Sequence, residues 1–373
     1  MANSSNINAP EPDQTTPSGK LPASSLVSRL VVIGVIVFGM GFLFAYAGGW
    51  LTPRALTPAR IADRFEALNG VHPGFRRNHA KGVCVSGYFE SNGKGAALCK
   101  SSIFQTGRVP VVGRFSLGGG LPYAADSAQN VRGLGILFQL PNGEEWRTAM
   151  IDLPVFPVKT PQAFYELLLA SAPDPASGKP DPAKMKTFIE NNPESAKAFP
   201  LIGAKQKSSG FANSSFNSLN SFRFISTSGA VSAVRWSLAP LEAFEAIAAT
   251  DAQSTNKNQL FDSLIARIHH HALAWRLMIT VAQPGDPTDD SSIPWPPERQ
   301  QIEVGTLTID HVESDDTSVA RDINFDPLVL PNGIAASDDP LLSARSAVYS
   351  QSFTRREGEH KEASAISTTE TGK

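Results

Sequence analysis

The feature that most constrains this chain is an apolar run near its N-terminus. Residues 30–51, LVVIGVIVFGMGFLFAYAGGWL, carry no charged side chain. A helix needs about 20 apolar residues to cross the hydrocarbon core of a bilayer, so this run is long enough. We therefore predict a transmembrane helix at 29–51, preceded at 1–28 by a polar tail that is expected to be disordered.

A cleaved signal peptide is the alternative interpretation of this run. The triplet Ala45-Tyr46-Ala47 fits the small-residue pattern of a cleavage site. The long leading tail and the continuation of the run past this site favour an uncleaved anchor. Basic residues lie on both sides, so charge bias does not fix the orientation. We expect an inner-membrane anchor with the remaining chain in the periplasm.

Composition limits what the remaining chain can be. Its 373 residues are 41% hydrophobic, which is enough for one large core, and the formal net charge of -2 gives no general attraction for nucleic acid. Two cysteines, Cys84 and Cys99, are too few for a disulfide framework. In an oxidising compartment they can form one disulfide, and two separate buried thiols are the equal alternative.

The order of predicted elements indicates one α+β domain at 52–356, followed at 357–373 by a polar tail that we expect to be disordered. A short amphipathic helix is predicted to end at residues 69–70. Short β-rich runs broken by Gly and Pro fill 82–160 and are typical of an antiparallel sheet or barrel. Further helices are predicted at 162–172, 184–199, 260–275 and 338–356, with more strands at 221–240 and 275–312.

Two local patterns suggest redox chemistry on a metal. His79 lies in RRNHAKG, directly before a predicted strand. Arg345 and Tyr349 are four residues apart on a predicted helix and so share one face. A guanidinium beside a phenol favours the phenolate, which is a route to a tyrosine that binds iron at neutral pH, and tyrosine is the proximal haem ligand of catalases. Taken alone, however, a single histidine is more often structural, and an Arg–Tyr pair of this kind is more often an ordinary surface pair.

Together the two patterns resemble the haem catalase family, over about residues 76–356. Five blocks occur in the order of that family: RRNHAKGVCVSGYFE, GRFSLGGG, DSAQNVRGLGILF, LPVFPVKTPQAF and INFDPLVLPNGIAASDDPLLSARSAVYSQSFTRR. The resemblance implies an antiparallel β-barrel catalase core with surrounding helices and a bound haem b. The C-terminal helical domain of full catalases is expected to be absent.

The resemblance also implies roles for eight residues. His79 matches the distal histidine that moves a proton on the bound peroxide, and Ser116 matches the serine that orients this histidine. Tyr349 matches the axial iron ligand. The remaining matches are Arg345 beside that ligand, a distal aromatic, and three arginines around the haem carboxylates, namely Phe164, Arg76, Arg114 and Arg356.

The sequence departs from typical catalases around the distal pocket. Ile151 stands where the family carries an asparagine amide, and an isoleucine cannot donate a hydrogen bond. Strand alternation should turn the neighbouring Asp152 to the other face. Gly118 replaces a valine that narrows the channel, and Asn130 replaces a channel aspartate.

These departures favour a small catalase-related peroxidase. We expect it to reduce hydrogen peroxide or organic hydroperoxides with a small organic donor, with low catalase activity, in defence against oxidative stress. The alternatives are a haem isomerase or lyase of fatty-acid hydroperoxides and a haem-binding sensor without turnover. The oligomeric state is left open. A metal site at His269-His270-His271 is not expected, since consecutive helical residues point about 100° apart.

Overall fold

The computed structural model describes residues 23–48, 51, 55–127, 130–174, 177–248 and 256–368. The chain divides into two compact units, Met1–Thr57 and Pro58–Lys373, and each is described by itself.

The first unit contains helix α1, Ala23–Ala47. Its segment Leu26–Ala47 is long and apolar enough to cross a membrane, and a signal sequence has the same length and composition. The helix begins before the predicted start at Arg29, so residues 23–28 do not belong to a disordered tail. Ala, Ser, Leu and Arg are all compatible with a helix interior, which lets it extend toward the N-terminus. The rest of the predicted tail lies outside the described residues.

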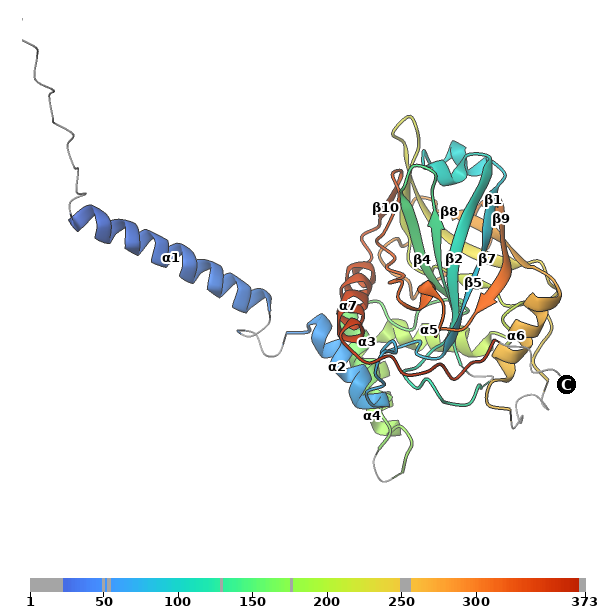
Figure 1. The fold of residues 1–373 in the computed structure, drawn as a ribbon, viewed down its shortest axis with the longest axis horizontal. Coiled ribbons are helices and arrows are strands. Elements are labelled where there is room, and N and C mark those ends of the chain that lie inside the picture. Colours follow the sequence, from blue (N-terminus) through green and yellow to red (C-terminus); the bar gives the residue numbers. More distant parts are fainter. Residues whose placement is uncertain are drawn as a thin grey trace, which may run out of the picture. The chain divides into compact units, whose positions relative to one another are not determined.

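A closed antiparallel β-barrel forms the centre of the second unit (Figure 1). Eight strands follow one another in the order β7-β5-β4-β3-β2-β1-β9-β8, and the pairing of β8 with β7 closes the ring. Two short strands, β6 and β10, extend the sheet beyond β7. The strands are β1 Gly82–Ser91, β2 Gly107–Leu117, β3 Arg132–Gln139, β4 Glu145–Ile151, β5 Phe216–Asn217, β6 Phe222–Ile225, β7 Val231–Pro240, β8 Leu273–Val281, β9 Gln301–Glu313 and β10 Ile334–Ala336. The predicted antiparallel barrel is confirmed.

Alternating side chains fill the barrel with the main hydrophobic core. Phe115 of β2 contacts Phe216 and Trp275, with ring centroids 5.8 and 5.7 Å apart. On the other side of the core Phe138 stacks on Trp146 at 4.8 Å. Strand residues two apart point to the same face, so these aromatic residues meet inside the ring while their neighbours point outward.

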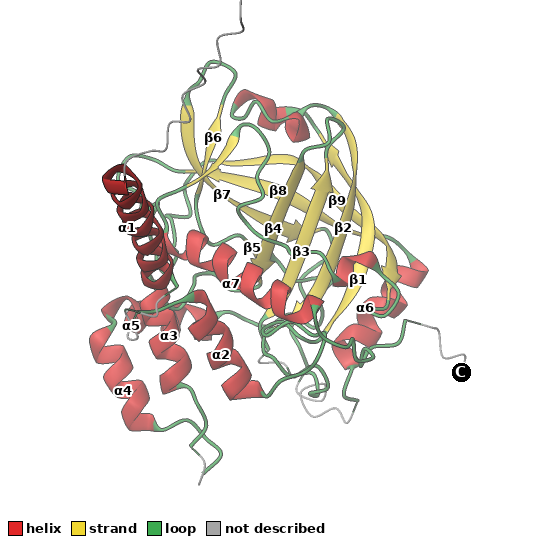
Figure 2. Ribbon diagram, turned by 60° about the vertical axis from the view of Figure 1, so that its left-hand side comes forward, coloured by secondary structure: helices red, strands yellow, loops and turns green. Residues whose placement is uncertain are grey.

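Helices cover the barrel from outside and gather beside one of its ends (Figure 2). Helix α2 packs against α3 and α7, and α4 packs against α3 and α5. The helices are α2 Pro58–Asn69, α3 Pro161–Ala170, α4 Pro182–Asn191, α5 Pro193–Ala204, α6 Gln259–His270 and α7 Pro340–Glu357, with short 3-10 turns at Lys94–Ala97, Ser102–Phe104 and Val319–Arg321. This arrangement confirms the predicted barrel with surrounding helices.

The predicted single helix at 184–199 is wrong. The structure has two helices there, separated by Asn192, whose φ of −130° and ψ of 76° lie outside the helical region. A residue before proline is disfavoured in the helical conformation, and Pro193 is well suited to the first position of a new helix. The second helix then continues through Pro200 to Ala204. The helix predicted at 260–275 likewise ends at His270, and β8 begins at Leu273.

The C-terminal segment up to residue 368 also differs from its prediction as a disordered tail. It runs from α7 across the lower end of the barrel toward α6 (Figure 1). Ile366 is 2% exposed and belongs to the main core. Glu359 forms an ion pair with Arg77, and Asn258 donates a hydrogen bond to the carbonyl of Ala365. Polar composition concealed this one apolar anchor, and residues 369–373 lie outside the described part.

Candidate active site

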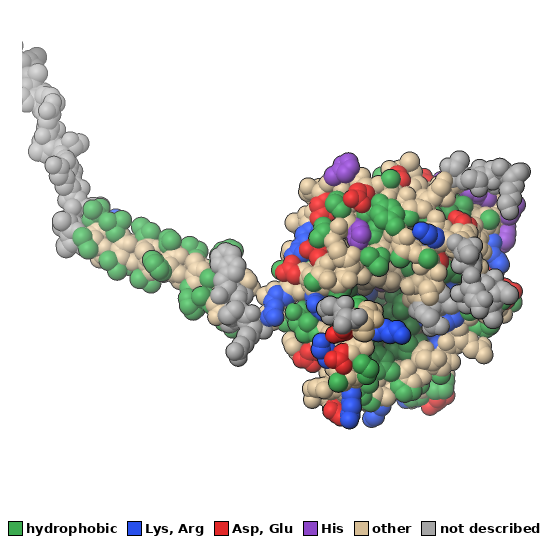
Figure 3. Space-filling view, turned by 90° about the horizontal axis from the view of Figure 1, so that it is seen from below, with side chains coloured by type: hydrophobic (Ala, Val, Ile, Leu, Met, Phe, Trp, Pro, Cys, Tyr) green, Lys and Arg blue, Asp and Glu red, His purple; other side chains and the backbone are tan. Residues whose placement is uncertain are grey.

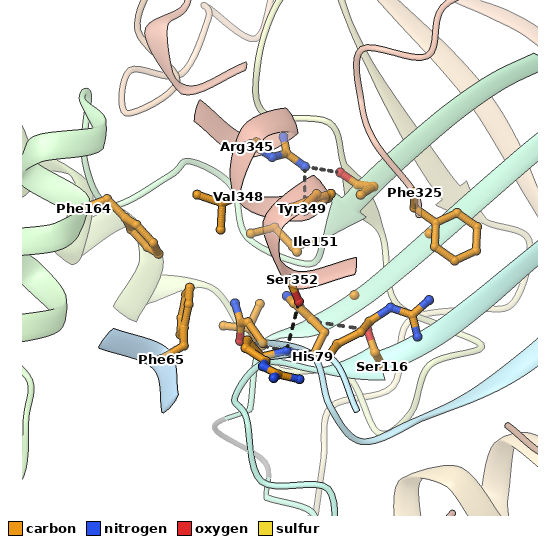
Figure 4. Close-up of a pocket in the computed structure, with 18 of the residues that line it drawn as sticks. Phe65, His79, Ser116, Ile151, Phe164, Phe325, Arg345, Val348, Tyr349 and Ser352 are labelled. Atoms are coloured by element: carbon orange, nitrogen blue, oxygen red, sulfur yellow. Dashed lines mark hydrogen bonds between the residues drawn. The ribbon is translucent and has the colours of Figure 1, made fainter. Parts of the chain in front are cut away.

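A cavity of about 540 Å³ lies between the barrel and helices α2, α3 and α7. All eight predicted site residues line it, although they come from positions far apart in the sequence. Figure 4 shows His79 and Ser116 at one side of the pocket and Tyr349 and Arg345, from α7, at another. Figure 3 shows a hollow in one face of the domain with hydrophobic side chains inside it and basic side chains nearby.

The imidazole of His79 is held by a neighbouring strand. His79 lies three residues before the start of β1 at Gly82 and has a positive φ of 59°, which is unusual for a residue with a side chain. Its Nδ1 lies 3.0 Å from the hydroxyl oxygen of Ser116 in β2. A Cβ on Gly133 of β3 would lie 2.9 Å from both groups, so only glycine leaves room for them. This contact fixes the ring and leaves Nε2 for chemistry.

The surroundings of His79 keep it neutral. Burial first, and then the nearby cationic Arg114, Arg76 and Arg345, together lower its pKa to about 4. Both causes disfavour the protonated ring. At neutral pH the imidazole therefore has a free lone pair and can accept a proton from a ligand in the cavity.

Arg114 holds the backbone of this histidine. Its guanidinium forms a buried ion pair with Asp315, 2.7 Å from Nη2 to Oδ2, and donates to the carbonyls of His79 and Ala80, both at 2.8 Å. The paired carboxylate raises the pKa of Arg114, against the lowering effect of its burial. Two of its hydrogen bonds thus fix the backbone of His79 and Ala80, and the ion pair with Asp315 holds the guanidinium itself.

Helix α7 presents one stripe of side chains to the cavity. The lining positions of this helix recur every three or four residues, as expected for one helical face: Leu341, Ala344, Arg345, Val348, Tyr349, Ser352, Phe353 and Arg356. Arg345 Nη2 lies 3.4 Å from the phenol oxygen of Tyr349 and donates to the carbonyl of Ala149 at 2.9 Å. Asn220 accepts a further hydrogen bond from Arg345.

Positive charge is concentrated at one part of the cavity. Arg76, Arg114 and Arg356 all line it, and Asp315 is the acidic partner of Arg114. Burial lowers the pKa of Arg356 to about 10, with repulsion by Arg114 adding to the effect. Burial, and then repulsion by Arg114 and Arg356, lower the pKa of Arg76 well below its usual value. The buried Nε of Arg356 has no hydrogen-bond partner in the structure.

Comparison with known proteins identifies this arrangement. The family model named Catalase matches residues 60–369, most of the chain. The chain belongs to the catalase family. It is 38% identical to the catalase-related peroxidase of Synechococcus elongatus, over 90% of this chain and 95% of that protein. It is 32% identical to the catalase-related peroxidase of Mycolicibacterium paratuberculosis, over 83% of this chain and 98% of that protein. These matches support the catalase-related peroxidase branch.

Solved catalases share the fold. A fungal catalase superposes with a TM-score of 0.69 and 21% identity, covering 80% of this chain. Catalase A from Saccharomyces cerevisiae gives the same TM-score with 19% identity, covering 82% of this chain. This chain spans 62% of the length of the fungal catalase and 65% of the length of the yeast protein.

Membership of the catalase family implies a haem cofactor, and the residues of the cavity fit one. Three arginines line the cavity, Arg76, Arg114 and Arg356, and the buried Nε of Arg356 has no partner, which suits a group that carries carboxylates. Apolar side chains on both barrel and helix suit a flat hydrocarbon ring: Leu134, Met150, Phe325, Leu341 and Val348 all line the cavity. Arg345 beside Tyr349 suits a phenolate ligand to iron.

The departures from typical catalases have visible structural consequences. Ile151, at the end of β4, lines the cavity, while Asp152 does not and instead accepts a hydrogen bond from the backbone N–H of Arg132. Gly118 and Gly119 also line the cavity, so no side chain narrows it at these two positions. Phe164 packs against Phe65 and Phe156 at 6.1 and 5.7 Å, which forms an apolar aromatic wall.

Several lining residues escaped the sequence-based prediction. Asn220, which lines the cavity, holds Arg345, and Asp315, which does not line it, holds Arg114; both come from distant segments, which no local pattern reveals. Leu219 has a positive φ of 62° at the edge of the cavity, which can be seen only in coordinates. Gly133, within GLG, was the one detectable signal, because a glycine inside a strand often marks close approach of another group.

Two other predicted features lie outside this site. Cys84 and Cys99 are both free and buried, so they do not form a disulfide. The thiol of Cys84 donates to Asp315 at 3.0 Å, and burial first, then Asp315, raises its pKa. His271 lies 3.3 Å from Glu242, and no group of three metal-binding side chains occurs among the described residues.

Proposed function

We propose that this protein is a haem b peroxidase that reduces hydrogen peroxide or organic hydroperoxides with a small organic electron donor. The observation that carries the proposal is that two pairs of side chains line one cavity. One pair is the neutral imidazole of His79 with Ser116, and the other is Tyr349 with Arg345. The chemistry consumes a hydroperoxide, two electrons and two protons, and gives water and an alcohol, or two waters from hydrogen peroxide.

Each of the eight predicted site residues has a definite role in this proposal. Tyr349 would hold the iron and Arg345 would stabilise its phenolate, while Arg76, Arg114 and Arg356 would bind the haem carboxylates and Phe164 would pack beside the ring. When bound, the haem supplies the redox-active iron. His79 accepts the proton of the hydroperoxide on Nε2 and returns it to the departing oxygen, and Ser116 keeps the ring in place through this transfer.

Peroxidase activity is favoured over catalase activity by the distal wall. Oxygen evolution requires a second hydrogen peroxide to be oriented in the same site. Ile151 offers no hydrogen bond for this purpose, and the glycines at 118 and 119 leave the wall open. An organic donor needs access more than orientation. A peroxidase of this kind would act in defence against peroxides. We further propose that α1, which is long and apolar enough to cross a membrane, is an inner-membrane anchor and that the catalytic domain lies in the periplasm.

The first test is the visible spectrum of the full chain purified in detergent with haem. We expect a Soret band of high-spin ferric haem ligated by tyrosinate, which is lost in Tyr349→Phe. Tyr88→Phe is the matched control, since Tyr88 stacks with Arg108 on the barrel and does not line the cavity. A wild-type chain that refuses haem, or a spectrum unchanged in Tyr349→Phe, would contradict the proposal.

The second test compares two activities of the same preparation. We expect the haem-loaded protein to oxidise an organic dye with hydrogen peroxide while evolving little oxygen. Oxygen evolution at a turnover typical of catalases would contradict the assignment to the peroxidases. Conversion of a lipid hydroperoxide without any donor would instead indicate an isomerase or lyase.

A further inference from the structure

Asn78 occupies a special place beside the proton-transferring histidine. It immediately precedes His79 and lines the same cavity. Its Oδ1 accepts hydrogen bonds from two backbone N–H groups, that of His79 at 3.0 Å and that of Gly119 at 2.8 Å. Because both partners are donors, the atom that faces them must be the oxygen, and the orientation of the amide is therefore determined.

The other half of this amide is uncommitted. Once Oδ1 is fixed, Nδ2 with its two N–H donors is turned away from the backbone of residues 79 and 119. Nδ2 makes no hydrogen bond within the part of the chain that the structure describes. A pre-oriented donor group next to His79 is thus available to a ligand of the cavity.

Two polar side chains that contact His79 are already engaged. The hydroxyl of Ser116 is used by Nδ1 of the histidine, and the guanidinium of Arg114 is bound to Asp315 and two carbonyls. Ile151 on the opposite strand carries no donor. A hydroperoxide beside His79 would meet an acceptor in the neutral imidazole, and the amide of the adjacent Asn78 adds a donor that has no partner among the described residues.

We propose that Nδ2 of Asn78 donates a hydrogen bond to an oxygen of the hydroperoxide bound beside His79, which makes Asn78 a catalytic residue. The inference rests on the peroxidase function proposed above. When His79 removes the proton of the hydroperoxide, negative charge builds on the oxygen that loses it, and a fixed donor stabilises that charge. Asn78 stands before β1, so the donor approaches from the segment of His79 itself rather than from β4.

Two substitutions separate this role from a structural one. Asn78→Asp keeps an oxygen for the backbone N–H groups of His79 and Gly119 but removes the donor. Asn78→Ala removes both functions without adding charge. Each variant is prepared as the full chain in detergent and loaded with haem, and its Soret band and thermal midpoint are compared with those of the wild type.

Two readouts are measured for each variant. The first is kcat/KM for cumene hydroperoxide across pH, and the second is the dissociation constant of cyanide from the ferric haem by titration of the Soret band. We expect both variants to lose about tenfold in kcat/KM on the pH-independent plateau and to bind cyanide about tenfold more weakly, the size of one hydrogen bond to a charged group. The pH at which kcat/KM falls on the acid side should be the same in Asn78→Ala as in the wild type.

Other outcomes overturn the inference. If Asn78→Asp behaves as the wild type and only Asn78→Ala is impaired, Asn78 merely holds the backbone. If only Asn78→Asp is impaired, the cause is its added charge. A wild-type chain that takes up haem and cyanide but shows no peroxidase turnover refutes the proposed function, while the cyanide titration still reports on the donor role of Asn78.

Discussion

At the scale of single residues, the site depends on close approaches that leave no space for a side chain at two glycines. Gly133 leaves the space in which His79 meets Ser116, and Gly82 leaves the space for the guanidinium of Arg114, 2.5 Å from where its Cβ would be. Arg114 in turn holds the carbonyl of His79. The imidazole is thus fixed by one side-chain contact and by its own backbone, and each can be tested separately.

Ser116→Ala removes the hydrogen bond to Nδ1 of His79. We expect about a tenfold loss in kcat/KM for peroxide with haem binding unchanged, because the ring becomes free to turn while the haem ligands stay. Steady-state dye oxidation and the Soret spectrum measure the two effects. Ser228→Ala, in the exposed turn between β6 and β7, should match the wild type, and an equally active Ser116→Ala would show that Ser116 does not orient the ring.

The pH dependence of peroxide reaction reports on His79. The imidazole is active in its neutral form, and burial together with Arg114, Arg76 and Arg345 lowers its pKa to about 4. The rate constant should therefore be flat at neutral pH and fall only as pH drops through about 4. Stopped-flow measurements across pH provide the test, with His79→Ala as the control that lacks this limb. A midpoint near the ordinary histidine pKa, about 6.5, would mean that the ring is not held in this environment.

At the scale of elements, the N-terminus of helix α7 links stability to the site. Asp339 caps the helix by accepting a hydrogen bond from Leu341 N at 2.9 Å. The same carboxylate accepts one from Asn220 at 2.7 Å, and Asn220 holds Arg345 beside Tyr349. The cap therefore positions both the helix and the guanidinium that faces the predicted iron ligand.

Asp339→Ala should show this double role. We expect a loss of about 1–2 kcal/mol in the free energy of unfolding and a lower affinity for haem. Asp181→Ala is the matched control, because Asp181 caps α4 in the same way, also before a proline, and does not line the cavity. Chemical denaturation and haem titration of both variants provide the measurements. Equal haem affinity in the two variants would show that the link through Asn220 carries no effect.

At the scale of the whole molecule, the C-terminal segment completes the domain. Arg77 of the segment before β1 contacts Glu66 of α2 and Glu359 after α7, at 2.7 and 2.9 Å. Glu359 and then Glu66 raise the pKa of Arg77, against the effect of burial. Ile366 then enters the core near α6. The C-terminal segment thus ties α2 and the segment before β1 to the core of the domain.

Ile366→Ala tests this closure. The side chain is 2% exposed, so we expect a loss of about 2–5 kcal/mol in the free energy of unfolding. Val319→Ala is the control, since Val319 is 76% exposed and its truncation should change stability by less than about 0.5 kcal/mol. Denaturation of the full chains in detergent measures both. A wild-type stability for Ile366→Ala would mean that the segment is detached in solution.

The sequence by itself determined the local features. Short β-rich runs broken by Gly and Pro in 82–160 predicted strands. The four-residue spacing of Arg345 and Tyr349 predicted a shared helical face, because that period is a property of the backbone. The resemblance to catalases named the eight residues that the structure brings to one cavity. The end of a helix before Pro193 could also have been predicted from the sequence, although our prediction of one helix at 184–199 overlooked it.

Only the tertiary structure decided the long-range partners. Closure of the barrel by β7 and β8, the hold of Asp315 on Arg114, and the hold of Asn220 on Arg345 join segments far apart in the sequence. The free donor of Asn78 also became visible only when Gly119 was found at its oxygen. Such contacts follow from how buried polar groups find partners in three dimensions, and no local period encodes that choice.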